Sequence, residues 1–137
     1  MRILALDYGE KRLGFAVSDP TGIIATPLCV VEVASDKEAL AETRRICEEV
    51  GAEKIVVGLP INMNGTKGPM AVKVSAFCEN LGKMIGITVD QYDERLSSSA
   101  AERVLLEGDV SRAKRKGLRD KLAAQIILQS YLEAQMI

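Results

Sequence analysis

Acidic side chains stand at three points of the chain, each at the end of a strand-like stretch or at the start of a long apolar segment. These acids are Asp7, then Asp93 or Glu94, and finally Asp120, next to residues 3–6, 87–92 and 122–132 respectively. Carboxylates without histidine or cysteine form an all-oxygen ligand set, which suits Mg²⁺ or Mn²⁺ better than Zn²⁺. Two such ions roughly 4 Å apart activate a water molecule and stabilise the leaving oxygen of a phosphodiester. If the acids converge, the pattern predicts metal-dependent phosphodiester hydrolysis.

Two of these acids also have a purely structural interpretation. Asp7 can hydrogen-bond the turn amides of Gly9 and Glu10, because aspartate often opens a turn. Asp120 interacts favourably with the helix dipole if it lies in a first helical turn, as expected here. Neither acid alone therefore predicts a metal site.

Asp93 and Glu94 present a choice between neighbours. Either can pair with Arg95 or Lys83 at the surface, where such pairs contribute about 0–1 kcal/mol. Alternation along a strand points neighbouring residues to opposite faces, so only one of the two acids faces a site on a given face. Periodicity leaves open which one does.

Composition limits the class of protein. The 137 residues are 47% hydrophobic and 27% charged, as expected of one globular domain spanning residues 1–137. Histidine is absent, which excludes serine–histidine and cysteine–histidine catalysis. Three widely spaced cysteines predict core thiols rather than disulfides or a zinc site. The first residues resemble neither a signal peptide nor a membrane span, which predicts a cytoplasmic protein with no membrane partner.

A dense basic run surrounds Asp120, although the net charge of the whole chain is −1. The run comprises Arg112, Lys114, Arg115, Lys116, Arg119 and Lys121. Such runs are usually solvated, yet cations at a helix start are electrostatically unfavourable, which favours an anionic partner. A phosphate backbone bound there would lie directly beside Asp120, and its affinity would fall steeply with salt.

The apolar periodicity predicts an α/β fold. We expect a hairpin over 3–19, a third strand from Ile23, Ile24 and 28–33, then strands at 54–58 and 87–93. The expected helices are 38–50, capped by Ser35 and ended by Gly51, then 69–85, 97–107 and 119–135, with a break at 108–117. Strands joined by helices pair in parallel, so the sheet should be mixed. The carboxyl ends of its parallel strands share one edge, where the acids can meet.

Four segments together resemble one known family. They are 6–19 (LDYGEKRLGFAVSD), 57–66 (VGLPINMNGT), 93–98 (DERLSS) and 120–132 (DKLAAQIILQSYL). This set is similar to the YqgF/RuvX family of Holliday-junction resolvases and ribosomal RNA processing nucleases, and the likeness covers essentially the whole chain. The family's Asp-Gly and Thr-Thr pairs are Asn64-Gly65 and Ser97-Ser98 here, and neither change removes a carboxylate.

The resemblance implies an RNase H-like fold with a five-stranded sheet of order 3-2-1-4-5, strand 2 antiparallel, and helices on both faces. It assigns metal binding and catalysis to Asp7, Glu94 and Asp120, and so selects Glu94 over Asp93. It also implies substrate contact or loop shaping for Arg12, Asn62, Gly65 and Arg95.

We therefore predict an endonuclease that cuts structured nucleic acid with Mg²⁺ or Mn²⁺. The resemblance favours maturation of the 5′ end of the small-subunit ribosomal RNA precursor, with ribosomal particles as potential partners. One alternative is a Holliday-junction resolvase, which would need a two-fold dimer to make paired cuts, whereas a processing nuclease can be a monomer. Another is a non-catalytic nucleic-acid-binding or transcription factor. An actin-like or sugar kinase would need a second such domain, which this chain lacks.

Overall fold

The structure, a computed structural model, describes residues 1–96 and 112–135, and along 112–121 it describes only the helical backbone. The strands of this part are β1 (Ile3–Tyr8), β2 (Arg12–Ser18), β3 (Ala25–Glu32), β4 (Lys54–Leu59) and β5 (Thr88–Asp93). The helices are α1 (Asp36–Val50), α2 (Pro69–Ile85) and α4 (Arg112–Gln135), and the 3₁₀ turn η1 (Glu94–Leu96) directly follows β5.

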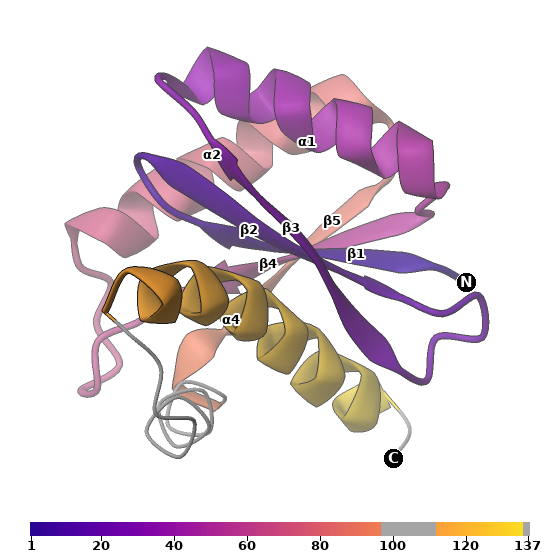
Figure 1. Ribbon diagram of the computed structural model, residues 1–137. Helices are drawn as coiled ribbons and strands as arrows, with labels where there is room; N and C mark the ends of the chain where they lie inside the picture. The colour runs from indigo at the N-terminus through magenta and orange to yellow at the C-terminus, as the bar shows by residue number, and fades with distance from the viewer. Residues whose placement is uncertain (97–111, 136–137) are drawn as a thin grey trace.

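The strands form a single mixed sheet in the order β3-β2-β1-β4-β5 (Figure 1). β2 runs antiparallel to both β1 and β3, whereas β1, β4 and β5 are mutually parallel. Strand order and strand directions confirm the expected RNase H-like arrangement. The carboxyl ends of β1, β4 and β5 therefore share one edge of the sheet.

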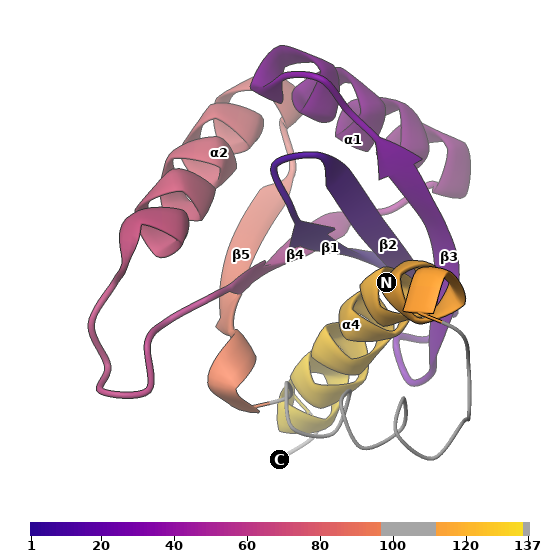
Figure 2. The same cartoon turned by 60° about the vertical axis from the view of Figure 1, so that its left-hand side comes forward.

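Helices cover both faces of this sheet, with α1 and α2 on one side and α4 on the other (Figure 2). Leu4 and Leu6 of β1 belong to the larger apolar core under α1 and α2. Ile3 and Ala5 belong to the core under α4. β1 is thus buried on both faces, as its continuous apolar run predicts.

Local signals set the ends of α1 and α2. Ser35 caps α1 by accepting a hydrogen bond from the Glu38 amide at 3.2 Å, and the Glu38 carboxylate accepts one from the Ala34 amide. Gly51 and Gly86 end the two helices with φ of 68° and 73°, a region that favours glycine. These boundaries confirm the prediction.

The start of the third strand was predicted wrongly. Ile23 and Ile24 lie outside β3 and are 48% and 61% exposed, because the Asp19 carboxylate accepts hydrogen bonds from both of their amides. Their backbone is thereby bent into the turn that precedes β3. A short-range hydrogen-bond network overrides their strand propensity.

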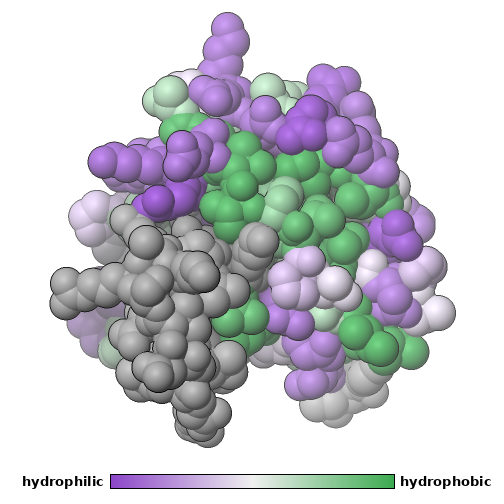
Figure 3. All heavy atoms as spheres, viewed as in Figure 1, coloured by the Kyte–Doolittle hydropathy of each residue, from purple (hydrophilic) through white to green (hydrophobic). Residues whose placement is uncertain are grey.

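β3 is an edge strand that carries apolar surface. In Figure 3 green atoms gather across the middle of the face on which Figure 1 shows β3, below the polar surface of α1. Pro27 lies in this strand, and the pairing with β2 shifts register between Phe15 and Ala16. Proline and register irregularities are features that discourage further strands from adding to a sheet edge.

The start of α4 was also predicted wrongly. The helix begins at Arg112 and not at Arg119. Residues 112–117, which were expected to belong to a break over 108–117, are therefore helical. Gly117 lies inside the helix, where glycine costs about 1 kcal/mol relative to alanine, and the helix-forming lysines, arginines and leucine around it offset that cost. The expected helix at 97–107 lies outside the described residues.

Candidate active site

Strand alternation brings Asp7 and Glu94 to the same face of the sheet. Ile3 and Ala5 of β1 face α4, and Asp7 continues this series at the end of the strand. Tyr92 of β5 packs in the same core, and Glu94 follows it by two residues. Both acids therefore stand at the carboxyl edge of the sheet, on the α4 side.

Gly58 of β4 makes room for the Glu94 side chain. A Cβ atom at Gly58 would lie 2.5 Å from Oε1 of Glu94 and 2.6 Å from Cδ1 of Ile127 in α4. The Glu94 side chain thus lies directly over β4, the strand between its own and that of Asp7. Sequence reasoning missed Gly58, although a glycine after the β-branched run 55–57 indicates a close approach.

The two acids are joined by a hydrogen bond between their carboxyl groups. Burial raises the pKa of Glu94 and the nearby Asp93 charge adds to this, while the bond to Asp7 acts in the opposite direction. Two neighbouring carboxylates repel each other when both are ionised, and a shared proton or a bound cation relieves this repulsion. A divalent cation can replace that proton, so the pair fits a hard metal ion.

The described residues contain no group of three acidic, cysteine or histidine side chains that could hold a metal ion. The predicted third acid, Asp120, has a side chain outside the described residues. Its backbone is the ninth residue of α4, so the expectation that it lies in a first helical turn is wrong. It precedes the buried Ala124 by one turn, and α4 begins at the edge where β1 and β4 end (Figure 1).

Asp93 is engaged elsewhere, with Arg95. Its carboxylate accepts hydrogen bonds from Nη2 of Arg95 at 2.7 Å, from Nε at 2.9 Å and from the Arg95 amide at 2.9 Å. These bonds lower the pKa of Asp93 and raise that of Arg95. They fix the Arg95 guanidinium against Asp93.

The loop between β4 and α2 is built around Asn62. The Asn62 side-chain amide donates to Oγ1 of Thr66 at 3.1 Å and packs against Gly68. Gly65 has a φ of 86° and its amide donates to the carbonyl of Asn62. Asn62 thus makes contacts that shape this loop, and its predicted contact with nucleic acid stays a prediction.

Residues 1–134 match the RuvX family, which is described as a Holliday junction resolvase family. The chain belongs to the RuvX family. Relatives from Syntrophomonas wolfei and Clostridium novyi, each named as a candidate pre-16S rRNA nuclease, are 51% and 47% identical to it. The first alignment covers 97% of this chain and 94% of the relative, and the second covers 98% and 99%.

Solved structures show the same fold at low sequence identity. Thermus thermophilus RuvC, in complex with a Holliday junction substrate, is 21% identical with a TM-score of 0.61, over 99% of this chain and 96% of RuvC. The fowlpox virus Holliday junction resolvase is 14% identical with a TM-score of 0.58, over 98% and 99% of the two chains. The RNase H-like fold of this RuvX protein is thereby confirmed.

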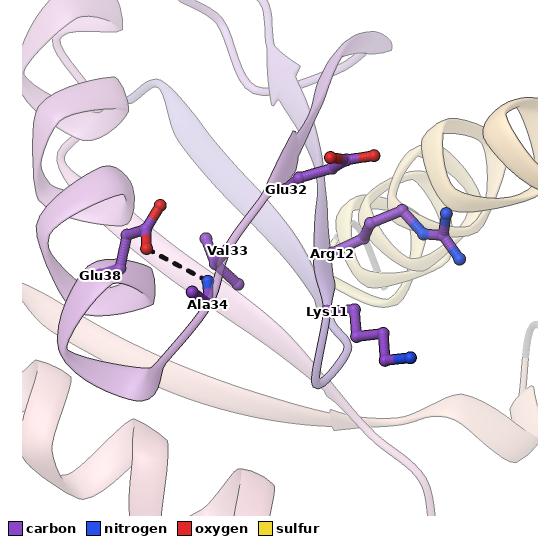
Figure 4. Close-up of a pocket in the computed structure, with 6 residues that line it drawn as sticks. All are labelled: Lys11, Arg12, Glu32, Val33, Ala34 and Glu38. Carbon is purple, nitrogen blue, oxygen red and sulfur yellow. Dashed lines mark hydrogen bonds between the residues drawn. The ribbon is translucent and has the colours of Figure 1, made fainter.

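Arg12 lines a pocket of about 420 Å³ beside the β1–β2 turn (Figure 4). Lys11 and Arg12 point to the α4 side, whereas Glu38 lies across the pocket on α1 and is occupied by its bond to Ala34. Two cations therefore stand on the side of the sheet that carries the acid pair.

The side chains of the predicted basic run 112–121 lie outside the described residues. In the described part of the chain, no helix is long and apolar enough to cross a bilayer.

Proposed function

We propose that this RuvX protein is a metal-dependent endonuclease that matures the 5′ end of the 16S ribosomal RNA precursor. The observation that carries the proposal is the hydrogen-bonded carboxyl pair of Asp7 and Glu94 at the carboxyl edge of the sheet. The names of relatives at 47–51% identity support a ribosomal RNA substrate. A single domain, residues 1–137, would carry out this cleavage. The reaction would take place in the cytoplasm, on precursor RNA in ribosomal particles.

Asp7, Glu94 and Asp120 would together hold Mg²⁺ or Mn²⁺. When bound, two such ions supply an activated water molecule and neutralise charge on the leaving oxygen. Asp7 follows the buried residues 3–6 of the central strand, so its backbone is held rigidly. Glu94 is partly buried over Gly58, which keeps water away from one side of the pair. Arg95, oriented by Asp93, offers a fixed cation to a phosphate beside the site.

A second candidate substrate is a four-way DNA junction. The RuvX family description favours it directly. Paired symmetric cuts would then require a two-fold dimer, whereas the RNA-processing reaction needs only a monomer.

The test incubates the purified protein with 16S rRNA precursor and with a four-way DNA junction, each in Mg²⁺, Mn²⁺ or EDTA. We expect cleavage near the mature 5′ end of the RNA in either metal and none in EDTA. Preferred cutting of the junction by a dimer would assign the resolvase function instead. Binding of both substrates without any metal-dependent cleavage would show a non-catalytic nucleic-acid-binding protein.

A further inference from the structure

Met63, at the tip of the loop between β4 and α2, holds an apolar side chain out in solvent. It is 88% exposed, more than any other large apolar side chain in the described residues, the next being Leu96 at 66%. Its neighbour Ile61 packs on the core under α2. The fold itself therefore gains little from an apolar residue at position 63.

Hydrogen bonds within the loop hold this tip in place. The Asn62 amide donates to the Thr66 carbonyl at 3.0 Å, and the Gly65 amide donates to the Asn62 carbonyl at 2.8 Å. Asn64 accepts hydrogen bonds from both the amide and the hydroxyl of Thr66. Met63 thus projects from an ordered turn, which lowers the entropic cost of a contact made by its side chain.

The loop also lies beside Arg95, at the same edge of the sheet as the acid pair. A Cβ atom at Gly65 would lie 3.8 Å from Nη1 of Arg95, the residue directly after Glu94. In Figures 1 and 2 the loop leaves β4 at the edge where β1 and β5 also end. The loop that carries Met63 therefore lies against the Arg95 side chain, at the sheet edge where the acid pair also stands.

We propose that Met63 packs against the face of an unpaired nucleobase next to the cleaved phosphodiester, while Arg95 binds the adjoining phosphate. This inference rests on the proposed nuclease function and adds the structural feature that the substrate must have. Base faces are stacked inside a duplex, so an apolar contact with one selects a nucleotide that is unpaired or at a strand end. Methionine suits bases of different shapes because its side chain is flexible and polarisable.

The test compares Met63→Gln with a matched control, Ile24→Gln. Ile24 is 61% exposed in the β2–β3 turn, at the opposite edge of the sheet. Binding is measured in EDTA, so that cleavage does not interfere, to an RNA duplex and to the same duplex with an unpaired strand. A 2-aminopurine in the unpaired strand reports base contact by its fluorescence. Thermal melting checks that both variants fold.

We expect Met63→Gln to weaken binding to the partly unpaired RNA by about fivefold, the low end of the cost of losing one aromatic base contact, because methionine has no ring. Its affinity for the duplex should be unchanged, and the fluorescence change on binding should be lost. Ile24→Gln should behave as the parent does. The salt dependence should also be unchanged, since no charge is removed.

Equal affinity of Met63→Gln and parent for the partly unpaired RNA would overturn the inference, as would equal weakening on both RNAs. Cleavage assays separate this from the proposed function. A parent that cuts RNA while Met63→Gln binds and cuts like it would leave the nuclease function intact and remove the base contact. If the parent cuts no RNA but loses its preference for unpaired RNA in Met63→Gln, the base contact stands and the proposed nuclease function fails.

Discussion

The side chains of Asp93 and Glu94 are adjacent in sequence yet serve different partners. Glu94 crosses over Gly58 toward Asp7, while Asp93 turns to the other side and binds the Arg95 guanidinium. β5 ends at Asp93, and Glu94, the first residue of η1, continues the alternation of the strand by one position. Glu94 thus lies beside Asp7, and Asp93 orients the Arg95 guanidinium.

Substitution of these two acids should separate their roles. Glu94→Gln should lower the single-turnover cleavage rate more than about a hundredfold, because loss of a group that only supports a metal ligand already costs about 10–100-fold. Asp93→Asn should cost less, since it disturbs the orientation of Arg95 but leaves the acid pair. Equal losses, or a larger loss for Asp93→Asn, would show that β5 presents its other face to the metal.

Replacement of Asp7 tests the pair without any substrate. In the metal-free protein the carboxylates of Asp7 and Glu94 repel each other when both are ionised, whereas the amide of Asp7→Asn can donate to the Glu94 carboxylate directly. The metal-free variant should therefore be at least as stable as the parent. An aspartate that only capped a turn would instead cost about 1 kcal/mol when replaced.

The measurement is four melting curves, parent and Asp7→Asn, each in EDTA and in excess Mn²⁺. Metal at ten times its Kd stabilises the folded parent by about 1.4 kcal/mol. This corresponds to roughly 3–5 °C in Tm for a domain of this size, and the variant should show little of it. If the variant melts lower in EDTA and both proteins respond alike to Mn²⁺, Asp7 is a structural turn residue.

Gly58→Ala should disrupt the pair through packing alone. The new Cβ would overlap both Glu94 and Ile127, and overpacking of this kind costs about 1–3 kcal/mol. The matched control is Gly82→Ala in α2, where a Cβ meets nothing within 4 Å and the helix should gain about 0.4–1 kcal/mol. Melting with and without Mn²⁺ should show a lower Tm and a smaller metal response for Gly58→Ala only. An unchanged metal response would mean that Glu94 does not need this space.

At the scale of elements, α4 is held to the sheet at both sides of its C-terminal half. Gln125 and Gln129 bond the backbone of Ala25 at the start of β3. On the other side, Tyr131 donates to Asp90 of β5 at 2.8 Å. This half of the helix is therefore fixed in register, which determines where its N-terminal half, with Asp120, meets the carboxyl edge.

The bond between Tyr131 and Asp90 makes this attachment sensitive to acid. The Tyr131 hydroxyl, and then Lys54 at 3.0 Å, lower the pKa of Asp90 in the folded protein. A carboxylate with a lowered pKa stabilises the fold above its unfolded pKa of about 4, and this contribution disappears as pH falls through the folded pKa. Asp90→Asn should thus lower Tm at neutral pH, and the difference from the parent should close below about pH 4. A gap in Tm that stays constant from neutral to acidic pH would show that Asp90 acts by packing alone.

At the scale of the whole molecule, a net charge of −1 provides no general attraction for nucleic acid. Binding must come from local cations, and the sequence concentrates six of them within residues 112–121. The structure shows this run to be helical backbone and not a loop. Nine residue steps of a helix span about 14 Å, the length of several phosphates along one strand.

Neutralising Lys114, Arg115 and Lys116 to glutamine should weaken binding to all sequences alike. The slope of log affinity against log salt should flatten by roughly two to three units, because each phosphate contact contributes about 0.7–0.9. The control of equal charge change is Arg44, Arg45 and Lys83, which pair with glutamates on α1 and α2. Titrations from low to moderate salt measure both, and equal slopes for the two triple variants would show that the basic run is merely solvated.

The sequence alone determined the elements and their order. Continuous burial of β1, the Ser35 cap and the glycines that end α1 and α2 are local signals, because they depend on residues a few positions apart. Parallel pairing of strands joined by helices then predicts that the acids share one edge. The family resemblance named Glu94, which periodicity had left undecided.

Only the tertiary structure decided how the site is assembled. Which of the two acids Asp93 and Glu94 faces the site, and the space for Glu94 over Gly58, depend on which face α4 covers, a contact between residues far apart in sequence. Local propensity acts over a few residues, whereas these features arise from contacts that form only when the whole sheet is in place.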